Sequence, residues 1–220
     1  MEHIVVTGAT GGIGLEFCRH YAAKSDKVTA ICRQKNAELE ALGVDILDQV
    51  DLGQDASYQK LAKYFEGKPI DLLINNAGVL HSDNLENFSV EQIRHQFELN
   101  AIAPLRVTQA VLPSLAKGSK IAMITSRMGS MADNTSGGYY GYRASKAALN
   151  MFTVSLAHDL KNRQIWVAAI HPGFVKTKMT NMNGDLKPEQ SVAGITKIIE
   201  AAKLDESGSF WHTNGERLPW

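Results

Sequence analysis

The sequence feature that most constrains this chain is a glycine-rich turn between an apolar strand and an amphipathic helix. His3–Thr7 predicts a short strand, and Ile13–Lys24 repeats apolar residues at helical spacing. The joining segment, Thr7-Gly8-Ala9-Thr10-Gly11-Gly12-Ile13-Gly14, carries glycines in the order G-x-x-x-G-x-G. Glycines at such positions permit a tight turn, approach of the main chain to a pyrophosphate, and close packing of helix on sheet. The pattern therefore predicts a dinucleotide-binding strand–helix unit.

The helix that starts at this turn presents free N–H groups and a partial positive charge to the phosphates of a cofactor. The alternative is a bare structural turn, since glycine turns are common in proteins. The position of the turn directly after the first strand favours the cofactor. We expect these cofactor contacts from the turn: Gly8, Thr10, Gly12, Ile13 and Gly14.

Strand and helix patterns alternate along the whole chain. After the first strand, further strands are predicted at Val28–Cys32, Val44–Val50, Ile70–Ile74, Lys120–Thr125, Ile165–Ile170 and Gly208–Trp211. After the first helix, further helices are predicted at Ala56–Phe65 with Asp55 as cap, Ser89–Ala116, Tyr142–Lys161 and Pro188–Ala202. Strands that are apolar throughout are typical of parallel sheets covered on both faces. The prediction is an α/β fold with one Rossmann-type, doubly wound parallel sheet of about seven strands and helices on both faces, as a single domain over residues 1–220.

Composition excludes several functional classes. The 220 residues include 23 basic and 23 acidic side chains, so we expect neither nucleic acid nor a membrane as partner. The seven histidines and the two cysteines, Cys18 and Cys32, show no metal-ligand spacing, and no metal is expected. A strand begins within a few residues of Met1, and no apolar run reaches membrane-spanning length. We therefore expect no signal peptide and a cytoplasmic protein.

The residues after the second and third strands bear on cofactor choice. An acidic residue at the end of the second strand would favour NAD, whereas this chain has Arg33 there. A guanidinium matches a 2′-phosphate in charge and geometry, so NADP(H) is favoured over NAD(H). The alternative is that Arg33 is an ordinary solvated loop residue. Asp51 and Leu52 follow the third strand and are expected beside the adenine.

Tyr142 and Lys146 are the predicted acid–base pair. Their spacing of four residues places both side chains on one face of a helix. A tyrosine has an ordinary pKa of about 10, and a neighbouring ammonium lowers it toward neutral pH. The pair can then exchange a proton with a carbonyl oxygen.

Asn100 lies inside the predicted long helix, four residues before Pro104. Proline has no N–H, so the Asn100 carbonyl loses its helical donor and the helix is expected to kink. The freed carbonyl can hold a water molecule. The alternative is an ordinary kinked helix with a satisfied asparagine.

Five motifs together resemble the short-chain dehydrogenase/reductase family. They are the glycine turn, Asn75-Asn76-Ala77-Gly78, Ser126, Tyr142-Arg143-Ala144-Ser145-Lys146 and His171-Pro172-Gly173. They extend from the first strand to the sixth, so the resemblance covers nearly the whole chain. It implies a catalytic tetrad of Asn100, Ser126, Tyr142 and Lys146, with Asn100 in a proton relay. It also implies cofactor contacts from Asn76, Ala77, Gly78, Tyr142, Lys146, Pro172, Gly173, Val175 and Thr177.

Two serines compete for the tetrad position. Ser126 directly follows the fifth strand, whereas Ser130 gives a serine–tyrosine spacing closer to that of many family members. Residues 133–138 read as a small insertion that lengthens the spacing from Ser126. Ser126 is therefore favoured over Ser130.

The C-terminal residues 208–220 resemble the C-factor/sniffer-like carbonyl reductase branch of the family. The resemblance implies an NADP(H)-dependent oxidoreductase that reduces an aldehyde or ketone, or oxidises the matching alcohol. It also implies a homodimer or homotetramer formed through the two long helices. A cofactor-binding signalling protein of C-factor type with little turnover is the alternative. A nucleotide-sugar epimerase would need a larger C-terminal substrate domain than this chain offers.

Overall fold

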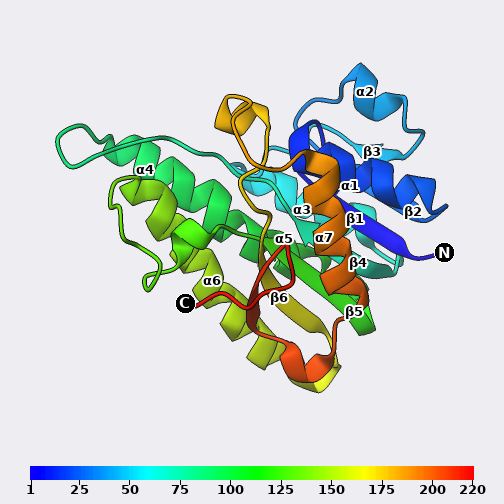
Figure 1. Cartoon of the computed structure of the whole chain (residues 1–220). Helices are drawn as coiled ribbons and strands as arrows, with labels where there is room; N and C mark the ends of the chain where they lie inside the picture. Colours follow the sequence, from blue (N-terminus) through cyan, green and yellow to red (C-terminus); the bar gives the residue numbers. More distant parts are fainter.

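Seven parallel strands form one sheet in the order β3-β2-β1-β4-β5-β6-β7 (Figure 1). The computed structural model describes all residues from Met1 to Trp220. The strands are β1 His3–Thr7, β2 Lys27–Ile31, β3 Asp45–Leu47, β4 Ile70–Asn75, β5 Leu115–Ile124, β6 Trp166–His171 and β7 Ser209–His212. The chain builds outward from β1 to β3 on one side and from β4 to β7 on the other. The predicted doubly wound parallel sheet is confirmed.

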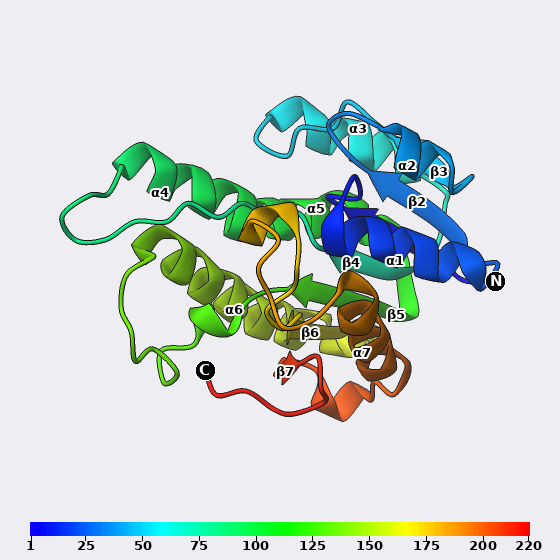
Figure 2. The same ribbon diagram turned by 45° about the horizontal axis from the view of Figure 1, so that its top comes forward.

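Helices cover both faces of the sheet. They are α1 Gly12–Ala23, α2 Ala37–Glu40, α3 Asp55–Phe65, α4 Val90–Phe97, α5 Ala103–Val111, α6 Tyr140–Leu160 and α7 Pro188–Glu200. Helices α1 and α7 pack side by side on one face, as Figure 2 shows, whereas α3 packs against α5 and α4 packs against α6 on the other.

The core consists of two apolar layers that the sheet separates. In β1, Ile4 and Val6 point into the layer beneath α1 and α7, and Val5 points into the layer beneath α3, α5 and α6. Every residue of β1 and β6 is buried. Burying one such aliphatic side chain stabilises the fold by roughly 1.5–3 kcal/mol. This two-sided burial explains why the strand sequences are apolar throughout rather than alternating.

The predicted single helix over residues 89–116 is instead interrupted once and ends early. A π-helical segment, Glu98–Ile102, separates α4 from α5, and the Ala103 N–H donates to the Glu98 carbonyl five residues back. Pro104 has no N–H for the Asn100 carbonyl, so the kink expected at Asn100 is present in this form. The helix also ends early, because a 3₁₀ turn with Pro113 in its centre leads directly into β5 at Leu115. The predicted end at Ala116 is therefore wrong.

Three smaller differences concern the segment around β3. Helix α2 was not predicted, although Asn36 caps it by accepting from the Leu39 N–H at 3.0 Å. Strand β3 is shorter than predicted, and Gln49 just beyond it has a left-handed backbone with φ of 52°. Asp55 is the first residue of α3, and Gln54 is its N-cap.

The C-terminal residues fold back along β7. The His212 N–H donates to the Glu216 carbonyl at 2.8 Å, and the Leu218 N–H donates to the Phe210 carbonyl at 2.9 Å. The Trp220 ring stacks on Phe210 with centroids 5.2 Å apart. These contacts fix residues 216–220 against the outer edge of the sheet. None of the helices combines the length and apolar character that a membrane crossing requires.

Candidate active site

The predicted site residues converge on the carboxyl edge of the sheet. In a parallel sheet all strands end at the same edge, so the turns after β1, β4, β5 and β6 lie along one line. The chain reverses its direction of strand addition between β1 and β4, and doubly wound sheets bind ligands in the crevice at such a point. The glycine turn follows β1, and Ser126 follows β5. The fold thus gives the two predicted motifs a common location.

Steric requirements show why the turn needs its glycines. Gly8 has φ of +68°, and a Cβ there would lie 2.8 Å from Ala77 Cα. Gly12 has φ of +53° and faces the Thr177 methyl group, 3.0 Å from its would-be Cβ. A Cβ on Gly14 would lie 2.2 Å from the Gly8 carbonyl oxygen. The turn is therefore packed so tightly that a side chain at any of these three positions would collide with its neighbours.

The end of β1 is tied to the turn after β4. The Thr7 hydroxyl accepts from the main-chain N–H groups of Asn76 and Ala77, each at 3.0 Å. The Asn76 side chain in turn donates to the Thr7 carbonyl at 3.0 Å. Thr7 was missed by the sequence analysis as a site residue. Its partners lie about seventy positions away, so only its place directly before Gly8 could have indicated the role.

Arg33 lies just beyond β2, exposed, and its guanidinium forms no ion pair and no side-chain hydrogen bond. The nearby Lys35, by contrast, pairs with Glu40 at 2.7 Å. The loop that carries Arg33 also contacts the glycine turn, since the Asn36 amide donates to the Thr10 carbonyl at 2.8 Å. A free guanidinium next to the glycine turn fits a dinucleotide that carries an additional phosphate.

Asp51 and Leu52 follow β3, the strand beside β2. The Asp51 carboxylate accepts from the Gly53 N–H at 3.0 Å, and Leu52 is buried. Both residues therefore lie at the same edge as Arg33. Their contact with an adenine remains a prediction.

Tyr142 and Lys146 are both buried on α6 and face the end of β5. The Lys146 ammonium donates to the Ile124 carbonyl at 2.9 Å and lies 5.9 Å from the centre of the Tyr142 ring. The Ser126 side chain acts on the Tyr142 hydroxyl, because it opposes the rise in the pKa of the phenol that burial causes. The structure therefore brings three of the four predicted tetrad residues together.

Burial determines the ionisation of this pair. It raises the pKa of Tyr142 to about 12, against the opposing effect of the Ser126 hydrogen bond. Burial lowers the pKa of Lys146 to about 8. The expected lowering of the Tyr142 pKa by Lys146 is not found, because desolvation penalises the phenolate and the opposing effect comes from Ser126. At neutral pH the phenol is protonated, which is the form that donates a proton to an oxygen.

Asn100, the fourth residue, lies fully buried in the π-helical segment. Its side chain donates to the Val79 carbonyl at 2.9 Å and accepts from the Val79 N–H at 2.8 Å. It also donates to the Ser145 hydroxyl on α6 at 3.1 Å. A Cβ on Gly78 would lie 2.9 Å from the Asn100 oxygen and 3.7 Å from the Lys146 nitrogen, so these groups adjoin. The structure thus places Asn100 beside Lys146.

The two candidate serines have different partners. Ser126 accepts from the Met128 N–H at 3.1 Å, and its side chain opposes the rise in the Tyr142 pKa that burial causes. Ser130 is also buried, but its hydroxyl accepts from the Asp133 N–H at 3.1 Å within the loop. The assignment of Ser126 to the tetrad stays a prediction.

The segment after β6 passes across the front of the glycine turn (Figure 1). The Pro172 carbonyl accepts from Ser191 at 2.6 Å, and Gly173 has a left-handed φ of +82°. Val175 is buried and pairs with Leu186. Together with the Thr177 contact to Gly12, this arrangement brings the predicted nicotinamide-side residues to the crevice.

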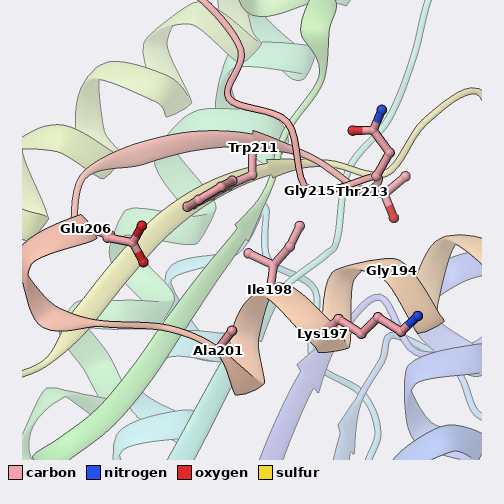
Figure 3. A pocket seen from close by; sticks show the side chains of 9 residues that line it. Gly194, Lys197, Ile198, Ala201, Glu206, Trp211, Thr213 and Gly215 are labelled. Atoms are coloured by element: carbon pink, nitrogen blue, oxygen red, sulfur yellow. The ribbon is translucent and has the colours of Figure 1, made fainter.

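A separate open cavity of about 260 Å³ lies between α7 and β7. Figure 3 shows Ile198 of α7 and Trp211 of β7 among its lining residues, with Lys197 and Glu206 at its margin. None of the predicted site residues lines it. We find no group of three or more His, Cys, Asp or Glu side chains arranged to hold a metal ion.

Comparison with known proteins gives several matches, two of which cover the whole chain. A dehydrogenase of Rhodococcus sp. (strain AD45), named 1-hydroxy-2-glutathionyl-2-methyl-3-butene dehydrogenase, is 37% identical over 226 residues, which cover 100% of both chains. The C-signal protein of Myxococcus xanthus is 42% identical over 155 residues, covering 69% of this chain and 93% of its own. The crystal structure of NADPH-bound carbonyl reductase from chicken fatty liver superposes with a TM-score of 0.89 at 30% identity, covering 100% of this chain and 99% of the other.

The model of the short chain dehydrogenase family matches residues 2–187, which contain the glycine turn, Tyr142 and Lys146. The match agrees with the parallel sheet, the turn geometry and the buried tyrosine–lysine pair described above. The chain is an oxidoreductase that belongs to the short-chain dehydrogenase/reductase family.

Proposed function

We propose that this protein is an NADP(H)-dependent carbonyl reductase that reduces an aldehyde or ketone, or oxidises the corresponding alcohol. The observation that carries the proposal is the buried Tyr142–Lys146 pair on α6, which faces the end of β5 at the same sheet edge as the glycine turn. This arrangement places a proton donor and a second hydroxyl where the crevice would receive a carbonyl group.

The crevice fits a dinucleotide through the glycine turn, the free Arg33 and the α1 N-terminus. Gly8, Gly12 and Gly14 would hold the pyrophosphate, and Arg33 would bind the 2′-phosphate of NADP(H). When bound, the cofactor supplies or accepts the hydride. The chicken carbonyl reductase that superposes on this chain holds NADPH, which supports the choice of cofactor.

Each side chain would have a separate role in the reaction of the substrate. Ser126 and Tyr142 would both hydrogen-bond the carbonyl oxygen, and the protonated phenol would donate its proton to that oxygen during reduction. Lys146, charged below its pKa of about 8, favours the phenolate that remains. General acid catalysis of this kind typically contributes 10²–10⁴-fold in rate. In the oxidative direction the same groups would return the proton.

The test is NADPH consumption at 340 nm with a panel of aldehydes, ketones and quinones, and NADP⁺ reduction with alcohols that include a glutathionyl alcohol. The name of the Rhodococcus relative motivates the last substrate. Tyr142→Phe should retain NADPH affinity and lose turnover by about 10²-fold or more, because it removes only the acid–base hydroxyl. Nearly normal turnover of this variant would refute the role of Tyr142.

Cofactor choice has its own test in Arg33→Asp. The change replaces a free cation with an anion, so it should weaken NADPH binding by about 10²-fold and leave NADH binding nearly unchanged. Arg33→Lys serves as the control, since it keeps the charge and loses the planar fork. Equal weakening of both cofactors would remove the argument for NADP(H).

The second candidate is a cofactor-binding signalling protein with little turnover, which the 42% identity to C-signal favours. It predicts tight NADPH binding without any productive carbonyl substrate. The presence of Asn100, Ser126, Tyr142 and Lys146 argues against it, because a protein that only binds the cofactor does not need a buried tyrosine beside a buried lysine. We also propose that the protein is cytoplasmic and forms a homodimer or homotetramer. Both cysteines are free and buried, which agrees with a reducing compartment.

A further inference from the structure

The segment after β4 runs between α4 and α6 and is held at every second residue. Asn100 clamps both main-chain groups of Val79, and the Gln96 side chain accepts from the His81 N–H at 2.9 Å. The third anchor is Asp83, which bonds to the start of α6. The first anchor fixes the segment to the π-helical segment, the second fixes it to the end of α4, and the third fixes it to the helix that carries Tyr142.

Asp83 makes three hydrogen bonds to consecutive main-chain N–H groups. Its two carboxylate oxygens accept from Tyr140 and Gly141, the latter at 3.2 Å, and its carbonyl accepts from Tyr139 at 2.8 Å. The first N–H groups of a helix have no partner within the helix, and Tyr139 offers no side-chain cap. A carboxylate from a distant loop therefore caps α6, where it also complements the helix dipole.

The backbone leading into α6 is strained. Gly137, Gly138 and Tyr139 adopt left-handed φ values of +64°, +63° and +51° in succession. A bulky residue such as Tyr139 adopts this conformation only when its surroundings enforce it. The hydrogen bond from the Tyr139 N–H to Asp83 is part of that enforcement. Without it, the turn would be free to relax and the first turn of α6 to fray.

Tyr142 lies in this first turn, one residue after the last N–H that Asp83 holds. In the proposed reaction its hydroxyl must reach the substrate oxygen, and a displacement of about 1 Å can reduce a catalytic rate 10²-fold. On the α4 side the helix start is already in close contact, since a Cβ on Gly141 would lie 2.4 Å from the Gln96 amide nitrogen. Asp83 supplies the restraint on the other side, toward the loop.

We propose that Asp83 is a positioning residue, which caps the catalytic helix from the loop after β4 and thereby aims Tyr142 at the substrate oxygen. The proposal rests on the proposed function of Tyr142. Asp83 itself need not touch substrate or cofactor. Because its loop borders the crevice, the same contacts couple the order of that loop to the placement of the phenol.

The test uses Asp83→Ala, which removes the two carboxylate bonds to Tyr140 and Gly141 and keeps the main-chain bond to Tyr139, and Asp83→Asn, which keeps one acceptor oxygen. Ser89→Ala is the matched control, because Ser89 caps the neighbouring helix α4 by accepting from the Gln92 N–H at 3.3 Å. Loss of a helix cap should lower the unfolding midpoint of both alanine variants by about 2–4 °C.

Turnover should separate the variants. Asp83→Ala should lower kcat by about 10–100-fold with NADPH affinity within twofold of wild type, Asp83→Asn should lie between, and Ser89→Ala should keep kcat. In a Tyr142→Phe background, Asp83→Ala should cause no further loss of the residual rate, because the residue acts through the phenol. A fall of equal size in both backgrounds would overturn the proposal.

Amide hydrogen exchange over residues 139–143 provides a readout that needs no turnover. Exchange should accelerate at least tenfold in Asp83→Ala and stay at the wild-type rate in Ser89→Ala. Unchanged exchange in Asp83→Ala would also overturn the proposal. If the wild type binds NADPH but reduces no substrate, the proposed function fails, and exchange alone still decides whether Asp83 holds the start of α6.

Discussion

A single methyl group at Gly14 tests the cofactor crevice directly. In Gly14→Ala the new Cβ would lie 2.2 Å from the Gly8 carbonyl oxygen and 2.6 Å from the Asn76 amide nitrogen, whereas ordinary contact begins at 3.4 Å. The turn must therefore open by about 1.2 Å, and its nearest neighbour is main chain that cannot rotate away. Overpacking of this kind costs about 1–3 kcal/mol, and the better helix propensity of alanine returns about 1 kcal/mol.

The net expectation is a loss of up to about 2 kcal/mol in the free energy of unfolding, or up to about 8 °C in the unfolding midpoint. The loss of NADPH affinity should be larger than the loss of stability, on the order of 10–100-fold, because the opened turn misplaces the N–H groups that face the pyrophosphate. Thermal unfolding and titration of NADPH fluorescence measure the two quantities.

Gly11→Ala is the control for stability. Gly11 belongs to the same turn, but its backbone is extended and a Cβ there would meet no atom within 4 Å. Its unfolding midpoint should therefore match that of the wild type or exceed it. NADPH affinity of Gly14→Ala within threefold of wild type would refute the reasoning that this turn is the pyrophosphate cradle.

Three further predictions follow from the site and its surroundings. Burial, with His212 adding to it, lowers the pKa of His171 to about 3, so the unfolded chain binds a proton that the folded chain rejects between pH 6.5 and 3. The free energy of unfolding should fall by up to about 1.4 kcal/mol per pH unit as the pH drops through that window. When it is measured by urea unfolding at several pH values, the free energy of unfolding of His171→Gln should depend less steeply on pH than that of the wild type. Asn100→Ala should lower kcat and shift its pH profile, since it removes the contacts that hold the loop and α6 beside Lys146; an unchanged profile would exclude the relay. Met151, exposed on α6, should lie in a subunit interface, so Met151→Glu should reduce the molar mass measured by light scattering if the oligomer forms there.

Local patterns were sufficient to predict most of the fold. The strand His3–Thr7 and the glycine turn were predicted correctly because both depend on residues adjacent in sequence. The irregularity near Asn100 was also predictable, since it follows from the missing N–H of Pro104. By contrast, the prediction of a helix to Ala116 did not take into account Pro113, which lies in the 3₁₀ turn that ends α5.

The site was predictable where motifs carry it and not where distant residues meet. Tyr142 and Lys146 are four residues apart, so helical geometry alone pairs them. Asp83 caps a helix 57 residues away, and nothing in its neighbourhood indicates the partner. The raised pKa of Tyr142 likewise depends on how completely its side chain is enclosed, which the sequence does not specify.

The return of the chain along β7 has a consequence for how molecules of this protein can meet. An exposed edge strand offers unpaired N–H and carbonyl groups on which a second sheet could add, and this is a common route to aggregation. Here the chain's own residues Glu216 and Leu218 satisfy the outer groups of β7, while β3 at the opposite edge has only three residues. Addition of a strand from a second molecule is thus blocked at the β7 edge and limited to three residues at the β3 edge. The helical surfaces are therefore left as the place for association.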